Sequence, residues 1–100
     1  MVEVQKIACV NSAGFVMNFS AKTEGGQSDD TGNYPIDQTR VIDLAETPFA
    51  EGREFWPQVH VVLGKTKSAG DHVIYRKNGQ TATYEVHGAT LNYSIKLIGN

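Results

Sequence analysis

The 100-residue sequence predicts an all-β protein, with residues 1–100 forming one antiparallel β-sandwich of about seven strands. Two observations carry this prediction. Apolar and polar residues alternate in several runs, which is the period of half-buried strands. Turn-forming residues recur every ~8–12 residues, and no long stretch combines helical periodicity with helix caps. A small β-barrel is the alternative, since its strands would show the same pattern.

The chain begins with two alternating runs separated by a turn. Val2–Val10 reads VEVQKIACV and is expected to be the first strand. Asn11 to Gly14 supply turn-forming residues, and strict alternation follows over Phe15–Ala21. We therefore expect a first hairpin from these two runs.

The next segment, Lys22–Tyr34, reads KTEGGQSDDTGNY and contains nothing that could fill a core. We expect a long loop there, and long loops in small domains are often functional. An extended segment restarts at Pro35, and Thr39–Leu44 is expected to be a strand. Ala45–Glu54, which contains Pro48 and Gly52, is expected to be a second connection.

The C-terminal half again shows alternating runs separated by turn-forming segments. Phe55-Trp56-Pro57 precedes an alternating strand over Gln58–Leu63, and Gly64–Asp71 is expected to be a turn or short loop. Pro57 is expected at a strand start or edge, because proline has no N–H to donate to a neighbouring strand. The last strand is expected over Thr90–Ile98.

Between these segments lies a clear hairpin signal. Two alternating runs, from His72 to His87, flank the dipeptide Asn78-Gly79, which is typical of a two-residue type I′ turn. That register would place His72 opposite Glu85 and bury one shared face of the two runs. The residues expected on that buried face are Val73, Tyr75, Ala82, Tyr84 and Val86.

Composition excludes several classes of protein. The single cysteine, Cys9, allows no intrachain disulfide and is expected to be a buried, unreactive side chain. The chain shows no signal peptide, so a cytoplasmic location or secretion without a leader is expected. The net charge is −2 and no basic cluster occurs, which argues against nucleic-acid binding.

No catalytic or metal-binding motif is present in the sequence. His60, His72 and His87 lack the spacing of a zinc site on one strand. Serines occur without a nucleophile elbow, and Gly25-Gly26 lacks the helix and lysine of a phosphate-binding loop. We therefore expect no enzyme activity and no cofactor. Calcium is the one metal left open, because the long loop is rich in oxygen ligands.

The candidate ligand-binding residues are Asp29, Asp30, Asn33, Tyr34 and Trp56. Carboxylates and an amide, gathered within a few residues, supply the acceptors and donors that sugar hydroxyls need. Tyr34 and Trp56 could each lie flat beneath a sugar ring, or could belong to the core.

Two stretches give the chain a resemblance to a known group of proteins. They are the opening strand running into Asn11-Ser12-Ala13-Gly14, and the closing segments GQTATY (Gly79–Tyr84), Gly88 and YSIKLI (Tyr93–Ile98). About a third of the chain is similar to the small, disulfide-free β-sandwich hemagglutinins of fungi and slime moulds. That resemblance implies a lectin without enzyme activity that binds cell-surface glycans, and it assigns no binding residue.

The leading functional prediction is thus a carbohydrate-binding, lectin-like module that recognises glycans or glycoproteins. An agglutinin needs at least two sites, so a homo-oligomer is expected. The alternative is a toxin-like or inhibitor-type domain that binds proteins or acts at a membrane surface. A structural or adhesion domain and an enzyme are further alternatives for the same sequence.

Overall fold

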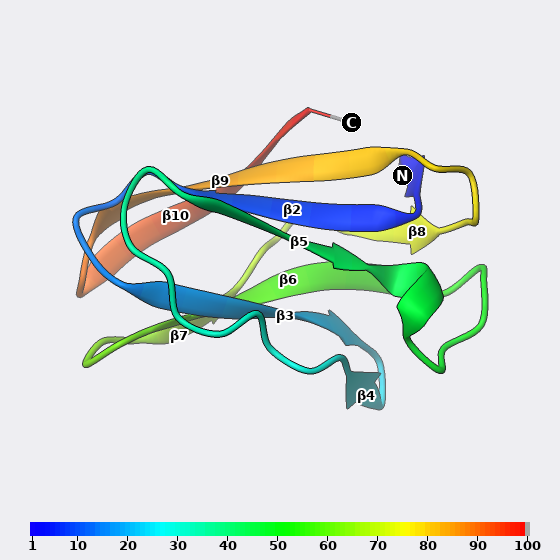
Figure 1. Cartoon of the computed structure of the whole chain (residues 1–100), viewed down its shortest axis with the longest axis horizontal. Helices are drawn as coiled ribbons and strands as arrows, with labels where there is room; N and C mark the ends of the chain where they lie inside the picture. Colours follow the sequence, from blue (N-terminus) through cyan, green and yellow to red (C-terminus); the bar gives the residue numbers. More distant parts are fainter. Residues whose placement is uncertain (100) are drawn as a thin grey trace.

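Two β-sheets packed face to face make up the protein in a computed structural model, which describes residues 1–99 (Figure 1). One sheet has six strands, in which β1, β8, β6, β3 and β4 follow one another and β7 also pairs with β6. The other has four, in the order β10-β9-β2-β5. The elements are β1 (Glu3–Val4), β2 (Lys6–Asn11), β3 (Met17–Thr23), β4 (Gly26–Gln27), β5 (Thr39–Asp43), the 3₁₀ helix η1 (Leu44–Glu46), β6 (Glu54–Val61), β7 (Thr66–Ser68), β8 (Val73–Tyr75), β9 (Thr81–Ala89) and β10 (Asn92–Gly99). The predicted all-β sandwich is confirmed.

The core lies between the sheets and is filled by the inward faces that the alternation predicts. In β6, for example, Phe55, Val59 and Val61 are fully buried, whereas His60 is exposed. Cys9 of β2 is also fully buried, as expected. Edge-to-face aromatic contacts, such as that between the Phe55 and Tyr75 rings at 6.1 Å, add to the packing. Within residues 1–99, no helix has the length and apolar character needed to cross a membrane.

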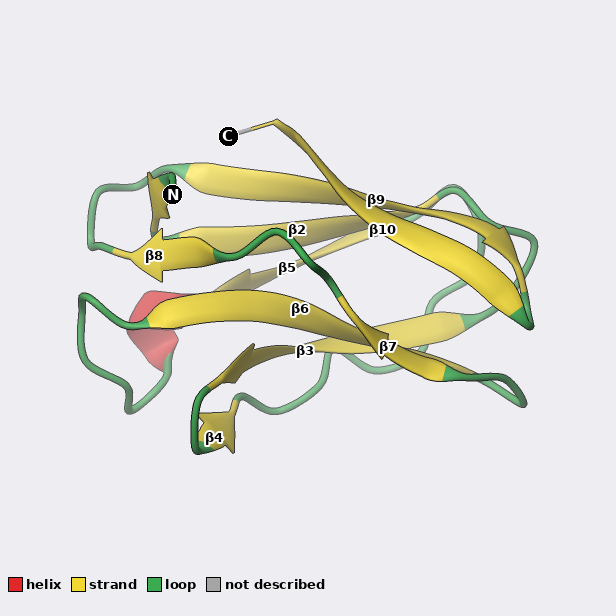
Figure 2. Cartoon of the chain, turned by 180° about the vertical axis from the view of Figure 1, so that it is seen from behind, coloured by secondary structure: helices red, strands yellow, loops and turns green. Residues whose placement is uncertain are grey.

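The chain crosses repeatedly between the two layers, so the predicted first hairpin is wrong. β2 belongs to the four-stranded sheet and β3 to the six-stranded sheet, as Figure 2 shows from behind. β2 instead pairs with β5 in antiparallel and with β9 in parallel orientation, and β1 pairs in parallel with β8. The sheets are therefore mixed rather than purely antiparallel. Alternation identifies which face of a strand is buried, but it does not identify the neighbouring strand.

The predicted hairpin at Asn78-Gly79 is wrong for the same reason. β8 lies in the six-stranded sheet and β9 in the four-stranded sheet. Gly79 has a positive φ of 75°, but Asn78 does not, which excludes a type I′ turn. His72 consequently does not face Glu85. The five residues predicted on the buried face are all buried, because the two runs approach one core from opposite sheets.

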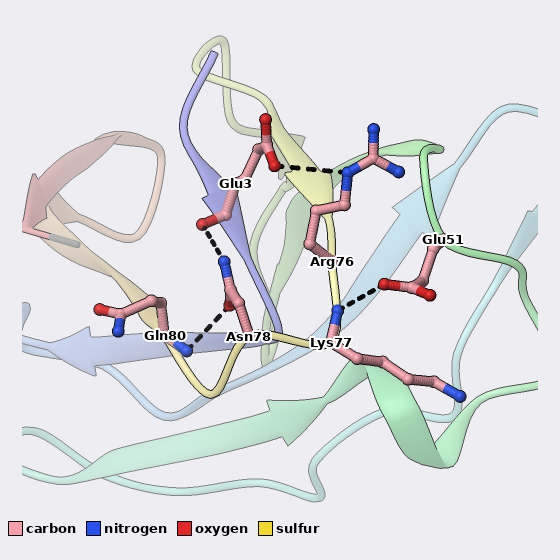
Figure 3. Close-up of polar contacts among 6 residues, drawn as sticks. All are labelled: Glu3, Glu51, Arg76, Lys77, Asn78 and Gln80. Atoms are coloured by element: carbon pink, nitrogen blue, oxygen red, sulfur yellow. Dashed lines mark hydrogen bonds and ion pairs between the residues drawn. The ribbon is translucent and has the colours of Figure 1, made fainter.

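Polar contacts hold the connection between β8 and β9, which crosses from one sheet to the other (Figure 3). The Asn78 side chain accepts a hydrogen bond from the Gln80 amide at 3.0 Å and donates to the Glu3 carbonyl of β1 at 3.0 Å. The Lys77 amide donates to the Glu51 carboxylate at 2.8 Å. The Asn-Gly pair therefore makes an Asx turn that joins the two sheets.

Most of the segment predicted as a long loop runs along the edge of β3. After the short strand β4, the amides of Ser28, Thr31 and Tyr34 donate to carbonyls of β3 at 2.8–3.0 Å. The Ser28 and Thr31 hydroxyls in turn accept hydrogen bonds from the amides of Ala21 and Phe19. Beyond β4, no regular strand within residues 1–99 pairs with this edge of β3. Backbone amides and side-chain hydroxyls of the segment supply the hydrogen bonds that a neighbouring strand would otherwise make.

Pro57 lies in the middle of β6, contrary to its predicted place at a start or edge. On one side it pairs with Ala21 of β3, and on the other its carbonyl accepts a hydrogen bond from the Ala69 amide at 2.9 Å. Pro57 faces the gap between β7 and β8, which pair with different parts of β6. The missing N–H of Pro57 is tolerated because neither β7 nor β8 pairs with this residue.

Candidate binding face of the six-stranded sheet

The outward surface of β3, β6 and β7 presents polar side chains in register. Paired residues of an antiparallel sheet point to the same side, so each pair places two side chains next to each other. One row contains Asn18, His60 and Thr66, and the next contains Ser20, Gln58 and Ser68. We call these two rows the polar face.

An open cleft of about 400 Å³ lies where the polar face meets the segment after β4. Two predicted residues, Asp29 and Asp30, line it together with side chains of the polar face. Every lining residue is polar: Asn18, Ser20, Gln27, Ser28, Asp29, Asp30, Gln58, His60 and Thr66. The cleft therefore offers hydroxyl, amide, imidazole and carboxylate groups to a ligand, without an apolar wall.

Hydrogen bonds between neighbours hold the planar side chains of this cleft. Asn18 Nδ2 donates to Asn33 Oδ1 at 2.9 Å, and His60 Nδ1 lies 2.8 Å from Thr66 Oγ1. Gln58 Nε2 donates to Ser68 Oγ at 3.2 Å. Each bond uses one polar atom and leaves a second polar atom on the same group, so these side chains are oriented before any ligand arrives.

A second cleft, of about 620 Å³, lies farther along the outward surface, where β6 begins. Its aromatic wall is formed by Trp56 and His72, whose rings stack at 4.2 Å with 17° between their planes. His72 Nδ1 lies 3.1 Å from Glu54 Oε1, which holds the imidazole in place. Thr23, Glu24 and Arg53 complete the lining.

The predicted site residues are distributed over both clefts and the core. Asp29 and Asp30 lie together, and Asp30 Oδ1 accepts a hydrogen bond from the Gly32 amide at 2.8 Å. Asn33 contacts the first cleft through Asn18. Trp56 is half-buried in the second cleft, on the outward side of β6. It is four residues from His60, or ~13 Å along the strand.

Tyr34 does not belong to this surface, and its prediction as a ligand platform is wrong. The side chain is 1% exposed, and its hydroxyl donates to the Cys9 carbonyl of β2 at 2.8 Å. Tyr34 is drawn inward because its backbone pairs with Met17 of β3, which places the ring between the sheets.

Sequence reasoning missed the strand residues of the first cleft. Asn18, Gln58 and His60 occupy polar positions of their alternating runs, and that alternation is the available signal that they point outward. Their proximity depends on the pairing of β3 with β6, which are far apart in the sequence. Within residues 1–99, no group of three or more histidine, cysteine, aspartate or glutamate residues is arranged to hold a metal ion.

Comparison with known proteins gives a structural likeness alone. No family model matches the chain, and no curated protein matches its sequence. A solved structure described as "Crystal Structure of Gram Negative Toxin" is similar over 92% of this chain, with a TM-score of 0.52 and 12% sequence identity. The match covers 22% of that longer protein. At this identity the likeness concerns the fold of one part of the toxin.

Proposed function

We propose that the outward surface of the six-stranded sheet binds carbohydrate without catalysing a reaction. The observation that carries the proposal is that the first cleft is lined by polar residues alone, while a stacked Trp56–His72 pair lies farther along the same surface. Sugar hydroxyls both donate and accept hydrogen bonds, which suits carboxylates, amides and imidazoles. The flat apolar faces of sugar rings suit an aromatic wall. A surface with both features fits a short oligosaccharide that reaches from one cleft toward the other.

The arrangement also favours binding by limiting its entropic cost. Asn18, Gln58 and His60 are oriented by hydrogen bonds within the protein, so a ligand would not have to immobilise them. Asp29 lies at the exposed rim of the first cleft, where its carboxylate can accept from two vicinal hydroxyls.

The test begins with a glycan array that identifies a bound sugar for the unmodified protein. Titration of that sugar is then followed through the fluorescence of Trp56, the only tryptophan in the chain. We expect Asp29→Ala and Gln58→Leu each to weaken binding by about tenfold, because each removes hydrogen bonds worth about 1.4 kcal/mol. Asp71→Ala removes an exposed carboxylate outside both clefts and is the matched control.

Two results would refute the proposal. One is the absence of binding to any glycan on the array. The other is unchanged affinity in Asp29→Ala, Gln58→Leu and Trp56→Ala, provided that circular dichroism shows the folded state in all three. The affinity of Trp56→Ala is measured by isothermal titration calorimetry, because this variant has no tryptophan. If the protein also agglutinates cells, sedimentation should reveal an oligomer, because a single site per particle cannot cross-link cells.

The likeness to part of a Gram-negative toxin favours a second candidate, a toxin-like β domain. In that case the protein would damage target cells, and free sugar would not protect them. Release of a cytosolic marker from cells, measured with and without the sugar found on the array, separates the two candidates. Agglutination blocked by sugar supports carbohydrate binding, and lysis unaffected by sugar supports the toxin-like role.

A further inference from the structure

Four loops lie together at one end of the sandwich, on the left in Figure 1 and on the right in Figure 2. They are residues 12–16, 35–38, 62–65 and 90–91. Each carries an exposed apolar side chain: Val16 is 40% exposed, Ile36 46%, Leu63 97% and Leu91 69%. We call this end, defined by these four side chains, the apolar tip.

Contacts between the loops make the apolar tip a defined structure. Asn11 is fully buried, and its Nδ2 donates to the Phe15 carbonyl of the first loop. The Asn11 carbonyl accepts a hydrogen bond from the Asp37 amide of the second loop at 2.7 Å, so Asn11 ties the first two loops together. The Val62 amide donates to the Val16 carbonyl at 3.0 Å, which joins the third loop to the first.

The third and fourth loops also pack tightly against each other. A Cβ added to Gly64 would lie 2.8 Å from the Thr90 side chain and 2.9 Å from its carbonyl oxygen, so only glycine fits there. The Tyr93 hydroxyl donates to the Lys65 carbonyl at 2.8 Å. The exposed leucines at positions 63 and 91 are thus presented by fixed turns.

Leu63 is unusual in two respects. Its side chain is almost completely exposed, and its φ of 61° lies in the left-handed region that a branched side chain disfavours. A backbone conformation of this kind persists where the surrounding structure imposes it, and it often marks a functional position. An exposed leucine in such a conformation contributes nothing to the core.

Charge is sparse at the apolar tip. Of the 11 acidic residues in the chain, only Asp37 lies in these loops. Lys65 lies beside Leu63, and Lys67 of β7 follows directly behind, with its ammonium 2.7 Å from the Tyr93 carbonyl. Apolar side chains in front with basic groups behind them complement the acyl chains and the anionic headgroups of a membrane surface.

We propose that the apolar tip docks on a phospholipid bilayer by inserting these side chains at the interface. The four side chains project from four separate turns, whereas a stable protein interface needs about 800 Å² of matching surface from each partner. A lipid surface adapts to projecting side chains and leaves the turn backbones among hydrated headgroups. The proposed site is separate from the clefts of the six-stranded sheet and does not depend on carbohydrate binding.

The test uses vesicles of phosphatidylcholine, with or without phosphatidylserine and free of glycolipid, in a flotation assay with the whole chain. We expect the protein to float with the vesicles, and more strongly when phosphatidylserine is present. The double variant Leu63→Asn and Leu91→Asn should reduce the partition coefficient at least about a hundredfold, or about tenfold for each leucine. Asparagine tolerates the left-handed conformation at position 63, so the fold should be retained.

The matched control is the double variant Val41→Thr and Ile98→Thr, which removes two exposed apolar side chains outside these loops. It should bind vesicles like the parent. A second readout uses Leu63→Trp in a Trp56→Phe background. Its emission should shift to shorter wavelength with vesicles and be quenched by brominated acyl chains, whereas Trp56 emission in the parent should not change.

Three outcomes would overturn the proposal. The first is no flotation of the parent with either vesicle type. The second is equal flotation of the parent and the Leu63/Leu91 variant, which would place membrane contact elsewhere. The third is a concentration-dependent dimer that the same variant abolishes in the absence of lipid, which would make the apolar tip a contact between two copies of the chain.

Discussion

Tyrosine hydroxyls connect the core to the backbone of neighbouring segments. Tyr34 donates to the Cys9 carbonyl at 2.8 Å, and Tyr84 donates to the Asp71 carbonyl at 2.6 Å. Burial raises the pKa of both hydroxyls well above the usual value near 10, with a further contribution from Cys9. Burial likewise raises the pKa of the Cys9 thiol. The folded state therefore requires these groups to stay protonated.

This requirement predicts a loss of stability at alkaline pH. Above about pH 10 the unfolded chain loses its tyrosine protons while the folded chain keeps them, so the free energy of unfolding falls as pH rises. Each such tyrosine contributes a slope of up to about 1.4 kcal/mol per pH unit. Urea unfolding between about pH 8 and pH 11 measures this slope, which should be smaller in Tyr34→Phe. Parallel curves for the parent and the variant would show that Tyr34 does not ionise on unfolding.

Side-chain hydroxyls complete one edge of the six-stranded sheet. Ser28 Oγ accepts a hydrogen bond from the Ala21 amide at 2.9 Å, and Thr31 Oγ1 accepts one from the Phe19 amide at 3.3 Å. The polar sequence of this segment is therefore needed by the fold as well as by the first cleft. Asp29, at the exposed rim of the first cleft, follows Ser28, and the bonds between Ser28 and β3 therefore fix its position.

We expect Ser28→Ala to lower the free energy of unfolding by about 1 kcal/mol, because the Ala21 amide loses its acceptor. Hydrogen exchange of that amide, followed by NMR, should accelerate. Ser94→Ala is a suitable control, since the Ser94 hydroxyl makes only a long contact of 3.5 Å with the His87 carbonyl. An unchanged exchange rate at Ala21 in the Ser28 variant would contradict this account of the edge.

The whole molecule depends on the closure of the two sheets over one core. β2 pairs with β5 and β9 within its own sheet, and its Ile7 and Cys9 side chains pack against residues from the other sheet. Most pairings join segments that are distant in the sequence. Access to the core therefore requires the layers to separate.

Cys9 provides a direct measurement of that separation. A thiol reagent should label the native protein slowly, because the side chain is fully buried, and should label the denatured protein quickly. In increasing urea, the labelling rate should follow the free energy of global unfolding. Rapid labelling without denaturant would show that β2 opens locally while the rest of the sandwich stays folded.

The alternation in the sequence by itself determined which face is buried in the longer strands, such as β6 and β9. Val73, Tyr84 and Cys9 lie in the core as their alternation predicted, and Gln58 and His60 point outward. Of the predicted site, Asp29 and Asp30 lie in the first cleft and Trp56 in the second, whereas Tyr34 lies in the core. Alternation is a local property, since successive side chains of any extended chain point to opposite sides.

Only the tertiary structure decided which strands are neighbours. Asn78-Gly79 marks a turn, but the turn crosses between sheets because the Asn78 side chain bonds to β1 and its own loop instead of closing a two-strand ladder. The clefts depend on the pairing of β3 with β6, and the apolar tip depends on four loops that meet at one end. Backbone hydrogen bonds are the same for every strand, so partners are chosen by how all the buried faces close over one core.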